Sequence, residues 1–417
     1  MLEAIVKTGA TPPPFFGLLN SYEKSRFWAG DVIVAEKFGF QMDMSSDGNT
    51  VAIGATGSAT SYVVGKVYIF VRDGINWSVQ VKLTPPDVAA TTQYHFGSSL
   101  ALDDKATTLI VGAHLAPGKS ASTGAAYVFI QTNNTWSFQA KLFASDGLSG
   151  DFFGYSVDIS SDGNTAVIGA RNGDGNTINT GTAYIFKRVG SNWSQFSEIF
   201  AIDGMSSNMF GESVAISGDG LLCLVSASLA KGNTTGTGAV YCFTNNGPIW
   251  TQQDKFFASD GAGSDYFGID ISMSKDGKTV IVGSYYDDDK GTNSGSAYIF
   301  GRSGTTWTYQ AKLVASDILA NDFFGWSVDI SDDGNTAIIG AYNGDGRIAG
   351  SGSVYIYTRD ESMTWTYQVE LTNTSALAND QCGYRVSISG DGRSALVVAK
   401  AGDGAVANSG TVYYYSS

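Results

Sequence analysis

The chain has 417 residues, of which 52 are glycine, and its 39 acidic side chains outnumber its 25 basic ones, giving a formal net charge of −14 at pH 7. This charge argues against nucleic acid and anionic membrane surfaces as partners, because both repel a polyanion. The sequence also lacks an apolar run of about 18 residues, so we expect no insertion into a membrane.

The first 17 residues form no part of the pattern that fills the rest of the chain. Three consecutive prolines, Pro12 to Pro14, favour a stiff extended segment, and apolar residues such as Ile5 and Phe15 have no repeat in which to be buried. The segment lacks the basic start of a secretory signal peptide. We therefore expect residues 1–17 to be an N-terminal arm that docks a domain of residues 18–417 onto a larger assembly.

From Phe38 onward the chain contains seven copies of one sequence repeat. A Phe-Gly step marks each unit, with Cys382-Gly383 in the seventh, and successive steps lie 57 or 58 residues apart. Each unit contains four apolar runs of strand length separated by Gly, Asn and Asp, without a helical period. In the third unit these runs are residues 155–160, 165–170, 182–187 and 193–201. The strands of each unit are called A to D in chain order.

The unit predicts a propeller blade. Asp162-Gly163, between strands A and B of the third unit, favours a tight hairpin. A sheet of four antiparallel strands is unable to bury both faces alone, and stacking such sheets around an axis solves this problem. The sequence therefore predicts an all-β fold, a seven-bladed β-propeller with four antiparallel strands per blade, in which the Phe of each Phe-Gly step fills the wedge between blades.

The two ends of the chain complement each other. Residues 412–415 form a C strand with no D strand after them. Near the N-terminus, Arg26 aligns with Lys312 and Asp31 with Asp317 when the chain is laid on the D strand and following loop of a later unit. We expect residues near Ser21 to Ala29 to supply the missing outermost strand beside Tyr413, which closes the ring and removes an exposed edge.

Residues 151–170 and 322–341 carry the pattern D-F-F-G-x-S-V-x-I-S-x-D-G-x-T-A-x-I-G-A. Over residues 18–417 the sequence thus resembles the FG-GAP repeats of integrin α-chain propellers, and more closely their bacterial and viral relatives. In integrin-like blades the A–B hairpin often binds calcium through several acids, whereas the hairpin here, Ser160 to Thr165, contains only Asp162. We predict that Asp162 and its equivalents are turn residues.

Acidic residues gather in two other kinds of loop, from strand D to the next strand A and from strand B to strand C. Both kinds emerge on the same face of a propeller and rim it with carboxylates, which are ligands that suit Ca²⁺. The sequence therefore predicts calcium sites that draw on Asp146, Asp151, Asp174, Asp260, Asp265, Asp288, Asp317, Asp322 and Asp345. In the alternative interpretation each Asp closes its own loop by accepting backbone N–H groups, and its repetition in nearly every blade favours this role.

Two pairs of residues stand outside the repeat. His95 and His114 both fall in the second unit, on one face, without a third ligand for a zinc site. Cys223 and Cys242 fall on the predicted B and C strands of the fourth unit, where they could face each other in a disulfide or remain free thiols.

The carboxylates recur with the blades, whereas an active site is a singular constellation, so we expect no enzymatic activity. The sequence favours a binding or structural propeller on an extracellular surface or a virion, attached to a protein or a glycan with the help of calcium. The alternative function is a propeller enzyme, a polysaccharide lyase or glycosidase, with its site in the central channel.

Overall fold

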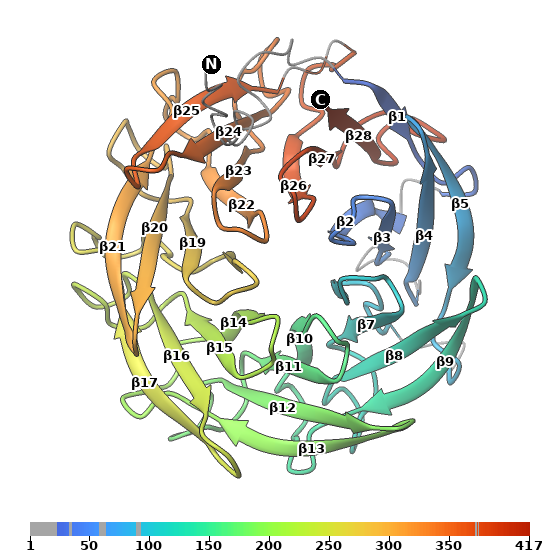
Figure 1. The fold of residues 1–417 in the computed structure, drawn as a ribbon, viewed down its shortest axis with the longest axis vertical. Coiled ribbons are helices and arrows are strands. Elements are labelled where there is room, and N and C mark those ends of the chain that lie inside the picture. Colours follow the sequence, from blue (N-terminus) through green and yellow to red (C-terminus); the bar gives the residue numbers. More distant parts are fainter. Residues whose placement is uncertain (1–22, 33–35, 58–63, 89–92, 372, 374) are drawn as a thin grey trace, which may run out of the picture.

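Seven antiparallel sheets of four strands stand around a central axis in the computed structural model (Figure 1). The structure describes residues 23–32, 36–57, 64–88, 93–371, 373 and 375–417. Within these ranges the fold is all β, which confirms the predicted seven-bladed propeller, and no helix there has the length and apolar character to cross a membrane. The predicted arm, residues 1–17, lies outside the described residues.

Blades 1 to 6 follow chain order, each with its first strand nearest the axis and its last strand on the outside (Figure 1). Blades 1 to 3 consist of β2 (Phe38–Met44), β3 (Thr50–Ala55), β4 (Lys66–Asp73) and β5 (Asn76–Leu83); β6 (Ser99–Leu102), β7 (Thr108–Ala113), β8 (Ala125–Thr132) and β9 (Thr135–Leu142); and β10 (Phe153–Ile159), β11 (Thr165–Ala170), β12 (Thr182–Val189) and β13 (Asn192–Ile199). Blades 4 to 6 consist of β14 (Phe210–Ile216), β15 (Leu222–Ala227), β16 (Ala239–Asn245) and β17 (Trp250–Phe256); β18 (Ile271–Met273), β19 (Thr279–Ser284), β20 (Ser296–Ser303) and β21 (Thr306–Leu313); and β22 (Phe324–Ile330), β23 (Thr336–Ala341), β24 (Ser353–Arg359) and β25 (Trp365–Glu370).

Blade 7 joins the two ends of the chain. Its strands are β26 (Cys382–Ile388), β27 (Ser394–Ala399), β28 (Thr411–Ser416) and, outermost, β1 (Ser25–Phe27). Arg26 pairs with Tyr413, as expected from the alignment. Phe27 of β1 is buried, and its ring centroid lies 4.9 Å from that of Phe70 and 5.1 Å from that of Trp77, both in blade 1. The predicted closure of the ring by an N-terminal strand is therefore confirmed.

The Phe-Gly step seats each inner strand against the preceding blade. Phe153 is fully buried in a core that blades 2 and 3 share. Gly154 has a φ of +84°, and a Cβ added to it would lie 2.4 Å from the carbonyl oxygen of Ala125. Only glycine allows the two backbones to approach this closely, which confirms the packing role predicted for the step.

Side chains from one blade also bind the inner strand of the next. Asp158 of β10 accepts the N–H of Ile216 in β14 at 2.7 Å. Asp43 accepts the N–H of Leu102 at 2.6 Å, and Asp329 accepts that of Ile388 at 2.8 Å. These carboxylates satisfy backbone donors on strand edges that face the channel and fasten neighbouring blades together.

The A–B hairpins fold as predicted. Asp162 Oδ1 accepts the Ser160 hydroxyl at 2.6 Å and the Asn164 N–H at 2.9 Å. The same two kinds of contact recur at Asp47, Asp219, Asp276, Asp333 and Asp391. The turn role of these residues is confirmed.

Cys223 and Cys242 of blade 4 do not form a disulfide, so of the two alternatives the free thiols are correct. Cys223 pairs in register with Phe243, while Cys242 pairs with Leu224. Because directly opposed residues of two strands share one face, this offset of one residue places the two cysteines on opposite faces of the sheet. Each is buried in a different inter-blade core, and both are free.

Candidate ligand site in the central channel

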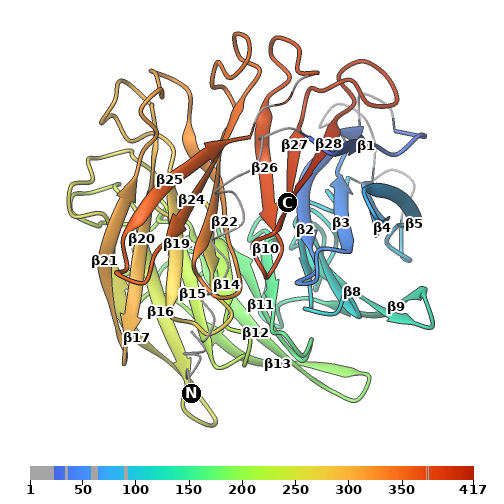
Figure 2. The same cartoon turned by 45° about the horizontal axis from the view of Figure 1, so that its top comes forward.

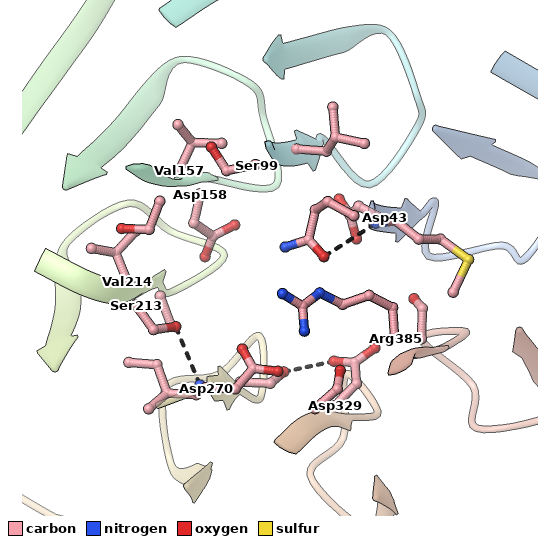
Figure 3. Close-up of a pocket in the computed structure, with 18 of the residues that line it drawn as sticks. Asp43, Ser99, Val157, Asp158, Ser213, Val214, Asp270, Asp329 and Arg385 are labelled. Carbon is pink, nitrogen blue, oxygen red and sulfur yellow. Dashed lines mark hydrogen bonds between the residues drawn. The ribbon is translucent and has the colours of Figure 1, made fainter. Parts of the chain in front are cut away.

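The inner strands of all seven blades line a cavity of about 530 Å³ along the axis of the ring. Figure 3 shows side chains from several blades converging on it, among them Asp43, Asp158, Asp270, Asp329 and Arg385. One end of this channel lies where strands A begin and strands B end, at the level of the D–A and B–C loops, and we call this end the D–A mouth. Figure 2 shows these loops gathered along one face of the ring.

Two columns of the repeat lie at the level of the D–A mouth, and both vary from blade to blade; the first lines the cavity in every blade, and the second does so at His114 and Arg171. The first holds the residue two positions after the Phe of the Phe-Gly step, and the second holds the residue that follows strand B. In blades 1 to 7 the first column reads Phe40, Ser98, Tyr155, Glu212, Ile269, Trp326 and Tyr384. The second reads Thr56, His114, Arg171, Ser228, Tyr285, Tyr342 and Lys400.

Aromatic side chains from blades 5, 6 and 7 form a continuous cluster at this mouth. Tyr285 contacts Trp326 with ring centroids 5.0 Å apart, and Trp326 contacts Tyr342 at 5.1 Å and Tyr384 at 5.8 Å. Phe40 of blade 1 lies 6.4 Å from Tyr384 and continues the cluster around the rim. We call these five residues the aromatic cluster.

Cationic groups lie beside the aromatic cluster. Lys400 Nζ is 3.9 Å from the centroid of the Tyr384 ring, and the Arg385 guanidinium lies 5.1 Å from the same centroid. Burial alone would raise the pKa of Tyr384, yet Arg385, Lys400 and Lys37 lower it below its ordinary value. This part of the mouth is therefore positive although the protein as a whole is acidic.

Blades 2 to 4 complete the rim. The rings of His95 and His114 are in edge contact at 5.0 Å, so the structure brings the two histidines together as expected. Burial, with His95 and Arg171 nearby, lowers the pKa of His114 to about 3, which keeps its imidazole neutral at pH 7. Arg171 donates to the Tyr155 hydroxyl at 2.8 Å and pairs with Glu212 at 3.2 Å.

Deeper in the channel the carboxyl groups are shielded from solvent. Burial raises the pKa of Asp43 to about 7 and those of Asp158 and Asp270 to about 6, although backbone N–H donors oppose the shift at each. These groups were absent from the sequence predictions. Asp43, Asp158 and Asp329 occupy one position of strand A, and the alternation of that strand places this position toward the channel.

The predicted acids of the D–A and B–C loops mostly close their own loops. Asp151, Asp265 and Asp322 each accept the N–H of the residue three positions earlier, at 2.7, 2.6 and 2.8 Å. In blade 4 the side-chain oxygen of Asn208 accepts the equivalent N–H, so a loop-closing residue at this position needs no charge. Asp174, Asp288 and Asp345 each accept an N–H five positions later, at 2.9, 2.7 and 3.1 Å.

The remaining predicted acids differ in their cationic partner. Asp260 pairs with Lys312 of strand D at 2.9 Å and accepts the Tyr298 hydroxyl at 3.1 Å. Lysines at the same position of strand D pair with loop acids in blades 1, 2 and 4, through Lys82–Asp31, Lys141–Asp87 and Lys255–Asp203.

In blades 3 and 6 a glutamate replaces this lysine. Glu198 faces Asp146, and burial together with that carboxylate raises the pKa of Glu198 to about 7. Glu370 is next to Asp317, which likewise adds to the effect of burial in raising its pKa. Asp146 and Asp317 therefore lie beside a second carboxylate instead of a lysine ammonium.

The loop acids predicted to bind calcium do not converge on a common point. Among the described residues, no three or more His, Cys, Asp or Glu side chains are grouped closely enough to hold a metal ion. The loop acids point one oxygen each at a backbone donor instead of converging on a common point. The arrangement does not fit a preformed calcium centre, and calcium binding stays a prediction.

A family model described as FG-GAP repeat matches residues 77–129, 136–186, 193–243, 250–300, 307–357 and 365–415. The chain belongs to the FG-GAP repeat family. Each matched FG-GAP repeat runs from strand D of one blade to strand C of the next, so the repeat straddles two blades. No curated protein matches the chain.

Two solved structures with this fold are distant from the chain in sequence. The β-propeller domain of Myceliophteria thermophila Cps50 (Swd1) superposes with a TM-score of 0.60 at 10% identity, over 94% of this FG-GAP chain and 99% of that chain. Kuenenia stuttgartiensis hydrazine synthase superposes with a TM-score of 0.57 at 14% identity, over 88% of this chain and 93% of that chain. At such identities the likeness concerns the fold alone.

Proposed function

We propose that this FG-GAP propeller is a non-enzymatic binding module, displayed on an extracellular surface or a virion, that attaches to glycans through the D–A mouth of its channel. The aromatic cluster is the observation that carries the proposal. The part-exposed ring of Trp326, which packs against the buried Tyr384, suits stacking against the apolar face of a sugar ring, and polar groups around it suit the hydroxyls of the sugar. A protein ligand at the same face is the alternative partner.

The fold family and the variation among the blades support the glycan proposal. An FG-GAP propeller is consistent with a binding or structural role, and its D–A and B–C loops gather on the face that holds this mouth. The two columns at the level of the mouth are among the most varied of an otherwise regular repeat, as expected where each blade contributes a different side chain to one ligand.

An enzyme with its site in the channel is the second candidate, because a glycosidase works with two carboxyl groups, one of them of raised pKa. Asp43 and Asp158 have this property. Both are already engaged by two backbone N–H donors each, however, which favours the structural role described above.

The two candidates are separated by a glycan array and a panel of chromogenic glycosides and acidic polysaccharides. We expect retention on a restricted set of glycans and no turnover of any substrate. Turnover that is lost in Asp43→Asn or Asp158→Asn would establish the enzyme instead, and the absence of both retention and turnover would contradict the glycan proposal.

A further inference from the structure

Two cations at the D–A mouth, Lys400 and Arg385, lack the ion-pair partner that Arg171 of the same rim and other cations of the molecule have. Lys82, Lys141, Lys255 and Lys312 are all in ion pairs with loop acids. Among the described residues, no carboxylate lies within ion-pair distance of Lys400 or Arg385. Neither cation is in a contact ion pair, although the charge of Arg385 acts on the channel carboxylate of Asp270 and opposes the rise that burial causes in its pKa.

Polar atoms that line the same mouth are also unsatisfied. Arg385 Nε, Arg171 Nε and Trp326 Nε1 are buried and have no hydrogen-bond partner. All three can only donate, so they select a ligand that presents acceptors. A buried donor without a partner costs free energy, which a bound acceptor would recover.

The cations lie against ring faces. Lys400 lies over Tyr384, and the Arg385 guanidinium lies 5.9 Å from the Trp326 ring centroid as well as beside Tyr384. Trp326 packs against Tyr384, with ring centroids 5.8 Å apart, so a ligand that stacks on Trp326 is within reach of both charges. The cavity of about 530 Å³ has the size of a site for a small molecule or for one or two sugar units.

We propose that the D–A mouth recognises an acidic saccharide, whose ring stacks on Trp326 while its carboxylate accepts from Lys400 and Arg385. This inference rests on the proposed glycan-binding function and names the class of glycan. A neutral sugar would use the ring faces and leave both charges unpaired. The charge-assisted contacts are the stronger part of the interaction.

Isothermal titration of the full chain tests the proposal with two matched pairs of probes: sialyllactose against lactose, and trigalacturonic acid against maltotriose. At least one acidic probe should bind about tenfold more tightly than its neutral counterpart, because hydrogen bonds to charged groups are stronger than those between neutral groups. Its affinity should fall as salt is raised, since salt screens charges at an open mouth.

Two variants locate the site, and one serves as a control. Lys400→Met and Trp326→Ala should each lower the affinity for the acidic probe by about tenfold or more. Lys231→Met changes an exposed lysine in the B–C loop of blade 4 and should leave that affinity unchanged. Thermal unfolding checks that each variant is folded; if Trp326→Ala is not, Lys400→Met decides.

The possible results distinguish a failure of the acidic preference from a failure of glycan binding itself. Equal affinity for acidic and neutral probes, lost in Trp326→Ala, would overturn the acidic preference and leave glycan binding in place. Acidic binding that Lys400→Met leaves unchanged would overturn the site. No binding of any probe, together with an empty glycan array, would overturn the inference and the proposed function together.

Discussion

Asp43 fastens two blades together with a carboxylate that burial makes hard to ionise. It accepts N–H groups from Met44 of its own strand and from Leu102 of blade 2, at 2.9 and 2.6 Å. Burial nevertheless outweighs these donors and raises its pKa to about 7. The contact between the blades is therefore linked to the protonation of this side chain.

This linkage predicts a pH dependence with a definite sign. Because the pKa of Asp43 is higher in the folded than in the unfolded chain, the folded chain binds more protons, and its free energy of unfolding falls as pH rises from about 4 to about 7. Asp43→Asn removes this titration. The stability of the variant relative to the wild type should rise by roughly 2–4 kcal/mol over that interval.

Thermal unfolding of both proteins at several pH values measures the effect. Asp162→Asn is the matched control, because hydrogen bonds from Ser160 and Asn164 outweigh burial and lower the pKa of Asp162. Its titration falls below pH 4, so its difference from the wild type should stay flat from pH 4 to 7. A flat difference for Asp43→Asn as well would contradict the argument.

At the scale of the strand, one position of strand D sets the charge of each blade rim. It is lysine in blades 1, 2, 4 and 5, paired with a loop acid, and glutamate in blades 3 and 6. If the predicted calcium binds anywhere on the rim, we expect it beside Glu198 and Glu370, where a cation would take the place of the ammonium group.

The difference between lysine and glutamate at this position of strand D provides a test of calcium binding. Millimolar calcium should raise the Tm of the wild type and a chelator should lower it, because an ion that binds only the folded state stabilises that state. The double variant Glu198→Lys and Glu370→Lys should lose this response and gain roughly 1 kcal/mol without calcium from two new ion pairs.

Lys255→Glu is the reverse change, since it places the glutamate of blades 3 and 6 into blade 4, and it should lower the Tm in the absence of calcium. A wild-type Tm that neither calcium nor chelator shifts would show that Asp146, Asp317 and the other predicted ligands serve their loops only.

The repeat made the strands predictable, and the site less so. Strands β10 to β13 lie within two residues of the predicted bounds at every end, because each depends on local alternation and turn residues. Tyr155, Arg171 and Glu212 meet at the mouth only through the relative placement of neighbouring blades, which no local pattern encodes. The two columns could have been singled out as irregular positions, but not as neighbours.

At the scale of the whole ring, β1 is the only described strand from the N-terminal part of the chain that pairs within the sheet of blade 7. Deleting residues 1–30 removes β1 and exposes the edge of β28, and the loss of Phe27 alone should cost roughly 3–5 kcal/mol. Deleting residues 1–15 leaves β1 in place and should cost far less. Equal losses in denaturant unfolding would argue against closure by β1.

The shorter deletion also tests the predicted arm. If residues 1–17 dock the propeller onto a larger assembly, the full chain should associate and the chain without residues 1–15 should not, as measured by light scattering. A monomer in both cases would contradict the arm as an assembly device and leave the closure result unaffected.

The closure by β1 also governs when the molecule can finish folding. Phe27 pairs with Val412, so β1 waits for a partner strand that lies far along the chain. At synthesis rates of roughly 5–20 residues per second, this wait is on the order of tens of seconds. During it Phe27 can pack on Phe70 and Trp77 of blade 1, but the backbone edge of β1 has no partner strand. A nascent chain of this design is therefore exposed to mispairing at this edge until β28 has been made.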